Sequence, residues 1–463
     1  MRKVVIKRLQ TKLPSGKFDN RKIVEDVNYY ISTVEKIVPF PYLYTKKSKI
    51  DSIASGIKEK TALTPLQFYE HFLRLQGAYN VGHMYCEFPH NNYHRFVENG
   101  GGILPFKCVL DDDSVSVTST LKPGMVLLDG DRVLSINGLR ADSLYNVFCG
   151  YEGGLRALKI RRVSRSFAEY LWLNGINPPF QIKFARGGSI SSCMLEGYRP
   201  KVNAPPFKAL KQVNPGNLGD IISYSVVQDT IAYIDFKSMQ SVNSNRFNEF
   251  LATTFQDIKT RKIGMLVIDL RRNSGGNSIH GATLINYFNS RPYRMTANKK
   301  WLVSREYKAN YKRMFPWYVR GLAVTMTRKA YFKHQEGTFF KYKNPSSPIE
   351  PAPNENRFTG KVYVLIANRT FSSAMMMANA VKDYSLATVV GEPSGDAPNH
   401  LGEIVAVRLP NSGISCWLPS ALFIRANGDQ EDNNPVVPDI VIKNVDKMEV
   451  SDLLGQLRGV PQQ

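Results

Sequence analysis

The sequence lacks the marks of several common protein classes. No apolar run of about eighteen residues occurs, so we expect no membrane-spanning segment. The five cysteines are odd in number, far apart and without a CxxC pair, which argues against a disulfide framework and against a zinc site. Residues 1–18 are basic but have neither the apolar centre nor the cleavage site of a signal peptide. Either the protein stays inside the cell or its export signal is not part of this sequence, so its localisation stays unknown.

What the sequence has in excess is positive charge. Its 61 lysines and arginines outnumber 39 acidic residues and give a formal net charge of +22. The excess is diffuse, with concentrations at residues 156–165 and 291–333. Such charge favours acidic partners, but no helix-turn-helix, zinc-finger or RNA-binding signature accompanies it. We therefore interpret it as a solvated basic surface and do not expect nucleic acid as the main partner.

Residues 361–395 contain the most informative pattern of the chain. A β-branched apolar run at 361–367 predicts a buried strand, and the segment 374–381 has the spacing of a helix that packs on a sheet. Ser372 and Ser373 stand between them, at the start of the helix. A serine there is held at a sheet edge, beside helix N–H groups that could stabilise a negative oxygen. The alternative is structural, because Ser-Ser before an apolar run is a common helix N-cap.

The first part of the chain predicts helices and one strand. With 463 residues, of which 43% are hydrophobic, the chain is long enough for two to four domains. Apolar residues at helical spacing run through residues 17–80, and alternation after a tight turn places His83 at the entrance of a strand. We expect residues 1–98 to form a helical region that ends in this strand.

One histidine pair in this region has the spacing of metal ligands. His90 and His94 would lie on one face of a helix. Pro89 and two asparagines argue against that helix, so we expect no metal site there. A lone histidine such as His83 is most often structural as well.

Residues 99–200 predict a β domain. The stretch 122–139, KPGMVLLDGDRVLSINGL, has Pro-Gly, Asp-Gly and Asn-Gly turns around two apolar strands. It resembles part of a PDZ-like domain, which captures extended peptides by strand addition. FQIKFARGG, at 180–188, resembles the closing strand and hairpin, and residues 144–175 between them predict a helical insertion. Residues 201–220, rich in Pro and Lys, predict a linker.

From residue 221 to 463 the pattern is α/β. Residues 230–236 and 264–270 predict strands, and 244–262 an amphipathic helix. RRNSGGN follows the second strand, and its two glycines allow a sharp turn that exposes N–H groups. The motif matches neither of the nucleotide-binding fingerprints GxGxxG and GxxxxGK(S/T). Residues 291–345 predict a basic, aromatic insertion.

Six short motifs, in order, carry a resemblance. They are GHMY, PGMVLLDGDRVLSING, VIDLRRNSGGN, TFSSAMM, VVGEPSG and VVPDI. The set resembles the tail-specific or C-terminal-processing peptidases, serine peptidase family S41. The resemblance implies an α+β multidomain fold: a helical N-terminal region, a PDZ-like domain and an α/β core of the ClpP/crotonase type. It also implies a hydrolase that cleaves peptide or unfolded protein without metal or organic cofactor, in a family whose members are often exported.

The resemblance assigns a nucleophile and an oxyanion hole. The nucleophile falls on Ser372, three residues before Met375, which replaces a usual acid. The N–H of Ser373 and that of Gly275 or Gly276 would form the oxyanion hole. The sequence leaves the choice between the two glycines open.

The expected general base differs from that of the better-known branch of family S41. That branch uses a lysine where this chain has Ala397, so we expect the tricorn-like, histidine-dependent branch. His83 then matches the base, although Met84 replaces the usual hydroxyl residue. His280 and His400 are the alternatives.

An acid before the final Pro-Asp-Ile completes the expected triad. Asp432 matches, with Glu431 adjacent and Asp429 close. A neutral histidine oriented by a carboxylate can take the proton of a serine hydroxyl. The leading hypothesis is therefore a serine endopeptidase; the rivals are an inactive relative that binds peptides and, more weakly, a basic nucleic-acid binder. Substrate preference and oligomeric state do not follow from the sequence.

Overall fold

Two apolar runs of the sequence form neighbouring parallel strands at the centre of a six-stranded sheet. In the computed structural model these are β12 (Met265–Asp269) and β15 (Lys361–Ile366). The sheet has the order β10-β11-β12-β15-β16-β19. Its other strands are β10 (Ile222–Val227), β11 (Ile231–Phe236), β16 (Thr388–Gly391) and β19 (Ile440–Val441). β10 runs antiparallel to β11 and the remaining pairs are parallel, so both faces of the sheet need helical cover.

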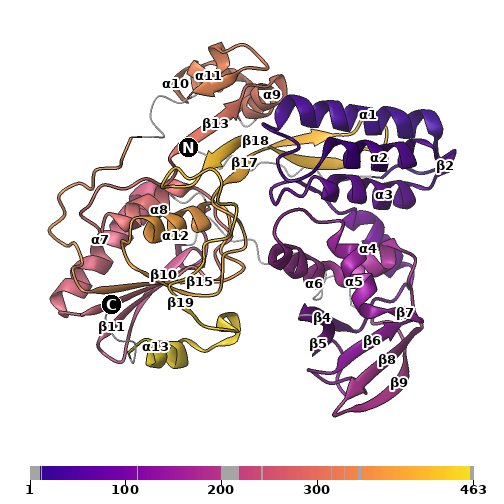
Figure 1. Ribbon diagram of the computed structural model, residues 1–463, viewed down its shortest axis with the longest axis horizontal. Coiled ribbons are helices and arrows are strands. Elements are labelled where there is room, and N and C mark those ends of the chain that lie inside the picture. Colours follow the sequence, from indigo (N-terminus) through magenta and orange to yellow (C-terminus); the bar gives the residue numbers. More distant parts are fainter. Residues whose placement is uncertain are drawn as a thin grey trace. The chain divides into compact units, whose positions relative to one another are not determined.

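Helices cover both faces of this sheet, as Figure 1 shows. One face packs against α7 (Ser244–Thr260), α8 (Ser278–Ile285) and α12 (Ser373–Asp383). The other packs against α13 (Val450–Arg458), through three buried leucines. The predicted strands and helices of the α/β region are therefore confirmed.

The structure describes residues 11–199, 218–240, 243–341 and 347–458, apart from residues 12, 112, 314 and 328. Most of the predicted linker, residues 201–217, lies outside the described residues. The chain divides into two units, and the sheet above belongs to the second. The first consists of Met1–Leu210, Trp301–Phe340 and Leu401–Ala421.

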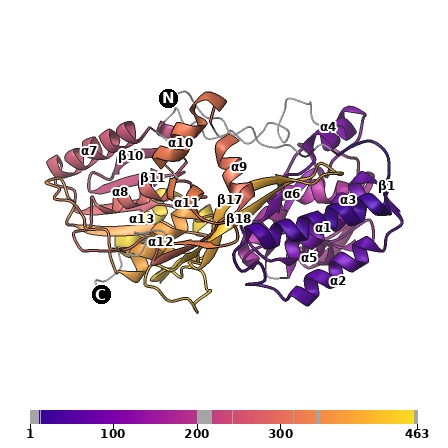
Figure 2. The same cartoon turned by 90° about the horizontal axis from the view of Figure 1, so that it is seen from above.

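Helices form the N-terminal region of the first unit. They are α1 (Asn20–Ile37), α2 (Lys47–Lys58) and α3 (Pro65–Ala78), of which α2 packs against both others (Figure 1 and Figure 2). Thr64 begins α3 with a capping box, because its hydroxyl accepts from Gln67 N–H while the Gln67 side chain accepts from Thr64 N–H. β1 (Phe18–Asp19) and β2 (Ala62–Leu63) pair beside these helices. The predicted helical region is confirmed.

The expectation that no helix forms around the histidine pair is wrong. α4 spans His90–Glu98, and Pro89 occupies its N-cap, where a missing N–H costs nothing. The ring centroids of His90 and His94 lie 6.3 Å apart. Within the described residues, no three His, Cys, Asp or Glu side chains gather closely enough to hold a metal ion.

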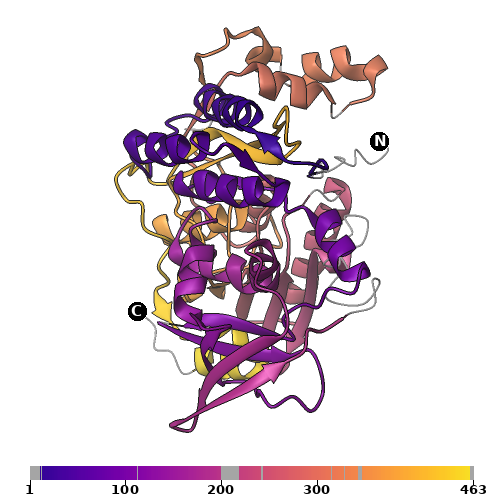
Figure 3. The ribbon, with the colours of Figure 1, turned by 90° about the vertical axis from the view of Figure 1, so that its right-hand side faces the viewer.

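A second sheet of the first unit has the order β4-β5-β6-β8-β9, and its strands lie in the lower part of Figure 3. They are β4 (Phe106–Asp111), β5 (Ser114–Thr120), β6 (Arg132–Ile136), β8 (Phe180–Arg186) and β9 (Ser189–Leu195), with β7 (Leu139–Arg140) paired to β6. The predicted helices between them are α5 (Ala141–Cys149) and α6 (Arg156–Leu173). One predicted strand, the run before Gly130, is wrong. It forms a loop because Leu128 N–H donates to the Asp131 carboxylate at 2.7 Å.

The predicted basic insertion mixes strands with helices. β13 (Asn298–Leu302) and β14 (Phe339–Lys341) join a sheet with β17 (His400–Arg408) and β18 (Ser415–Ile424). Short helices lie between β13 and β14: α9 (Arg305–Arg313), a 3₁₀ turn (Trp317–Val319), α10 (Arg320–Thr327) and α11 (Lys329–Lys333). The short strand β3 (Tyr85–Cys86) pairs with β18. None of the described helices is both long and apolar enough to cross a membrane.

Candidate active site

Ser372 has a backbone conformation that ordinary helix caps do not use. It lies just before α12 with φ 54° and ψ −128°, and its hydroxyl makes no capping hydrogen bond. An ordinary N-cap serine has extended backbone and accepts a bond from the first turn, so the structural alternative does not account for this residue. A non-glycine residue in such a region costs about 1–3 kcal/mol. Strain of this kind is concentrated at functional sites, and the half-buried Ser372 is a candidate.

The turn that presents Ser372 is held by buried hydrogen bonds. The Thr370 hydroxyl donates to Leu270 O at 2.8 Å and accepts from Ala367 N–H at 3.1 Å. The carbonyl of Thr370 accepts from Gly395 N–H at 3.0 Å. Thr370 is fully buried, so these bonds are shielded from water and can maintain the strained neighbour.

Asn273 connects this turn to the glycine turn after β12. Its backbone carbonyl accepts from Phe371 N–H at 3.1 Å. Its side chain donates to Phe236 O at 2.7 Å and accepts from Gly275 N–H at 2.9 Å. Sequence reasoning missed this residue, although an asparagine two positions before a glycine pair is the usual sign of a side chain that caps its own turn.

The two glycines are required by close backbone contacts. Gly275 has φ 93°, and a Cβ there would lie 2.8 Å from Ser372 Cβ and 2.9 Å from Ser373 N. Gly276 has φ 145°, and a Cβ there would lie only 2.1 Å from the carbonyl carbon of Met239. The glycine turn therefore lies directly against the serine pair, and larger residues would push it away.

Two N–H groups remain available beside the serine. Gly275 N–H is used by Asn273, whereas within the described residues the N–H groups of Gly276 and Ser373 donate to no protein acceptor. The Ser373 hydroxyl donates to Gly276 O at 2.8 Å and so ties the helix start to the glycine turn. Free N–H groups at a helix start and a glycine turn are typical of anion sites.

His83 lies in a tight turn of the first unit, whereas the serine pair belongs to the second. Met84 N–H donates to Val81 O at 3.0 Å across this turn, and Gly82 O accepts from Arg162 at 2.7 Å. The His83 side chain is half-buried, between the buried Gly82 and Met84. The turn is thus well fixed without burying the imidazole.

The alternative histidines are buried in the second unit. The His280 ring lies 4.7 Å from that of Phe247, and burial lowers its pKa. His400 stacks on Phe423, its Nδ1 bonds Pro398 O at 3.0 Å, and burial lowers its pKa to about 4. A base is most effective when its pKa lies near the working pH, so neither is well suited to the role.

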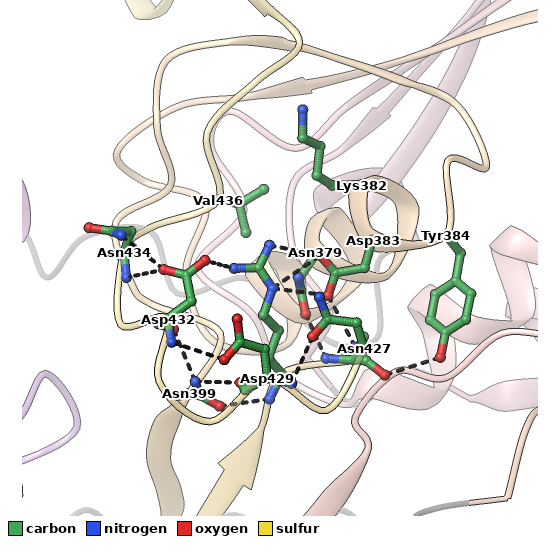
Figure 4. Close-up of polar contacts among 12 residues, drawn as sticks. Asn379, Lys382, Asp383, Tyr384, Asn399, Asn427, Asp429, Asp432, Asn434 and Val436 are labelled. Atoms are coloured by element: carbon green, nitrogen blue, oxygen red, sulfur yellow. Dashed lines mark hydrogen bonds and ion pairs between the residues drawn. The ribbon is translucent and has the colours of Figure 1, made fainter.

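The candidate acids lie in a loop fixed by Arg425, and Figure 4 shows the polar contacts of Asp432 and Asp383 there. The guanidinium of Arg425 bonds both oxygens of the buried Asp383, at 2.8 to 3.1 Å, and one oxygen of Asp432. The other oxygen of Asp432 accepts from the backbone and side chain of Asn434, both at 2.9 Å. The Asn434 backbone N–H, followed by Arg425, lowers the pKa of Asp432.

The neighbouring acids Asp429 and Glu431 differ in their hydrogen bonds and ion pairs. Asp429 accepts from Glu431 N–H at 2.9 Å and so shapes the loop. Glu431 is exposed, and in the part of the chain that the structure describes its carboxylate has no ion-pair partner. Met375 and Ala397, at the positions where the resemblance leads one to expect an acid and a lysine, are buried.

Comparison with known proteins gives a match to one family model and a likeness in fold to solved structures. Residues 230–442 match the sequence model of "Peptidase family S41". Mature CPAF complexed with lactacystin is 15% identical, over 95% of this chain and 98% of that chain, with a TM-score of 0.62. Mature CPAF is likewise 15% identical, over 91% of this chain and 92% of that chain, with a TM-score of 0.61.

These findings support the predicted architecture and the general class of chemistry. At this identity the solved structures show a shared fold: α+β and multidomain, with a helical N-terminal region and a mixed-sheet core. The family match covers the glycine turn, the serine pair and the loop of residues 429–434, here called the acidic loop. Residues 230–442 therefore match peptidase family S41, a family of serine peptidases.

Proposed function

We propose that this protein is a serine endopeptidase that cleaves extended or unfolded polypeptides through an acyl-enzyme on Ser372. The observation that carries the proposal is the strained, uncapped conformation of this serine beside two available N–H groups. The Ser372 Oγ attacks the scissile carbonyl carbon, the amine leaves, and water hydrolyses the ester that remains. No metal or organic cofactor takes part.

The oxyanion hole of this proposal consists of the N–H groups of Ser373 and Gly276. Gly276 is preferred over Gly275, because the N–H of Gly275 already donates to Asn273. Each such donor typically contributes about 3–4 kcal/mol to transition-state stabilisation. The bond from the Ser373 hydroxyl to Gly276 O supports this role, because it fixes the geometry of both donors before substrate arrives.

His83 is the proposed general base, and Glu431 the preferred acid to orient it. The His83 side chain is half-buried rather than enclosed, unlike those of His280 and His400. Both carboxylate oxygens of Asp432 already accept hydrogen bonds, one from Arg425 and the other from Asn434. Glu431 has a carboxylate that no described cation engages, and Asp432 remains the alternative.

A peptidase assay with matched variants tests the proposal. Wild-type protein should cleave a fluorescently labelled, chemically unfolded polypeptide, whereas Ser372→Ala and His83→Ala should lose at least about 10³-fold in kcat/KM. Ser451→Ala, an exposed serine far along the chain, should cleave like wild type. Wild-type activity that survives in purified Ser372→Ala would overturn the assignment of the nucleophile.

A protein that binds peptides without cleaving them is the second candidate. The engagement of Asp432 by Arg425, together with the apolar Met375 and Ala397, favours it. Its β domain could still capture an extended peptide by strand addition. Equal binding of the unfolded polypeptide by wild type and Ser372→Ala, with no cleavage by either, would support this candidate.

A further inference from the structure

Cys86 and Cys416 lie directly opposite each other on paired strands, although 330 residues separate them in the sequence. Cys86 ends β3 and Cys416 belongs to β18, both within the first unit. Their sulfur atoms are 2.9 Å apart, and both are free thiols. The spread of cysteines along the sequence gave no sign of this pair.

The register places this pair at a position suited to a disulfide. Glu87 N–H donates to Ser415 O at 2.8 Å, so the flanking pair is the hydrogen-bonded one. Cys86 and Cys416 therefore form a non-hydrogen-bonded pair, whose Cα atoms are about 4.5 Å apart in antiparallel strands. That separation lies within the roughly 4.4–6.8 Å range of protein disulfides.

The side chains around the pair hold the two strands in register. Trp417 Nε1 donates to Glu87 Oε1 at 3.0 Å, and the Tyr85 ring stacks on that of Trp417. Tyr69 also donates to Glu87 O, at 3.2 Å. A slip of β3 along β18 would break all of these contacts, so the sulfur atoms stay opposed.

No other pair of cysteines is placed in this way within the described residues. Cys108 lies opposite Val117 in its strand, and Cys193 lies opposite Ile182. Cys149 is on α5. An oxidised protein should therefore contain one specific disulfide and three free thiols.

We propose that Cys86 and Cys416 form a redox-sensitive disulfide site that ties β3 to β18, with a small disulfide such as oxidised glutathione as the oxidant. The half-buried Cys86 loses its proton and its thiolate attacks one sulfur of the oxidant, releasing one glutathione thiolate. The Cys416 thiolate then attacks Cys86 Sγ in the mixed disulfide and releases the second. Two protein thiols are oxidised, and one disulfide is reduced to two thiols.

The surroundings of the thiols set the rate of this exchange. Burial raises the pKa of Cys86, so little thiolate is present near neutral pH. Oxidation should accordingly be slow at pH 7 and faster at pH 9. A disulfide that closes so long a loop should raise the melting midpoint of the protein by roughly 2–6 °C.

The Cys86–Cys416 disulfide would also affect the proposed general base, His83, and this consequence rests on the proposed function. β3 begins two residues after His83, so the disulfide would fix the chain that leaves the histidine turn. Hydrogen exchange of the peptide that contains His83 should slow on oxidation. This readout does not depend on activity, so the disulfide can be tested even if the peptidase assignment fails.

Thiol counting and peptide mapping on the full-length protein test the proposal. After incubation with oxidised glutathione, we expect free thiols to fall from five to three and a Cys86–Cys416 cross-linked peptide to appear, both reversed by dithiothreitol. A count that stays at five, a cross-link between other cysteines, or a glutathione adduct that persists on wild-type Cys86 would overturn it.

Two variants separate this site from general thiol oxidation. Cys416→Ser should accumulate the glutathione adduct on Cys86, because the second attacking thiol is missing. Cys193→Ser, which removes another half-buried cysteine, should form the cross-link at the wild-type rate and keep the rise in melting midpoint. If Cys416→Ser fails to fold, the wild-type measurement still tests the proposal. Loss of the cross-link in Cys193→Ser would contradict the assignment of the disulfide to Cys86 and Cys416.

Discussion

The Ser373 hydroxyl donates a hydrogen bond to the carbonyl oxygen of Gly276 at 2.8 Å. This bond joins the start of α12 to the glycine turn after β12, two elements about a hundred residues apart in sequence. The neighbouring serines thus differ in their roles. Ser373 holds the backbone together, and Ser372 presents its hydroxyl in a strained conformation.

Removing the Ser373 hydroxyl should loosen the proposed oxyanion hole. We expect Ser373→Ala to lower kcat by about 10–10²-fold, because Gly276 N–H is no longer fixed, and to destabilise the protein by only about 1 kcal/mol. Steady-state kinetics and thermal unfolding measure the two effects. Ser274→Ala, an exposed serine in the same turn, is the control and should change neither. Equal kcat in Ser373→Ala and wild type would argue against this role.

Gly276 should tolerate no side chain. A Cβ would overlap the Met239 backbone at 2.1 Å, and φ 145° is strained for any other residue, so Gly276→Ala should cost more than about 3 kcal/mol in unfolding free energy. Gly264→Ala is the matched control, because a Cβ at Gly264 meets nothing within 4 Å. Chemical denaturation of both variants provides the comparison, and similar stabilities would contradict the close contact.

Elements with strong apolar periodicity could be predicted from the sequence, whereas contacts between residues far apart in the chain could not. The buried strands and amphipathic helices of the α/β region follow from apolar spacing alone, as does α3 from Thr64 and Pro65. The helix at His90 was missed because a proline that breaks a helix interior is harmless at its N-cap. No short stretch of the sequence reveals the role of Asn273 or the pairing of Cys86 with Cys416, because both depend on the tertiary structure.

His400 should make the protein less stable in mild acid. Its folded-state pKa, about 4, lies below the ordinary value of about 6.5, so between these values the unfolded state binds the extra proton. Stability should fall as pH drops from 6.5 to 4, by on the order of 3 kcal/mol from this residue. His400→Phe, which keeps a ring against Phe423, should flatten this part of the curve. Parallel curves for the two proteins between pH 7 and 4 would refute the prediction.

The acidic loop offers a comparison of two adjacent carboxylates. Glu431→Gln should lower kcat by about 10²–10⁴-fold without changing the melting midpoint, because the side chain is exposed and orients the base. Asp432→Asn should mainly lower the melting midpoint, because it removes the charge that Arg425 binds. Kinetics and thermal unfolding of both variants decide the matter. The reverse pattern would assign the orienting role to Asp432.

The nucleophilic character of Ser372 can be measured most directly with a fluorophosphonate probe, which phosphonylates only an activated serine. The folded wild-type protein should acquire a single adduct, mapped by mass spectrometry to Ser372, and Ser372→Ala should acquire none. A folded wild-type protein that remains unlabelled, or that is labelled at another serine, would contradict the account.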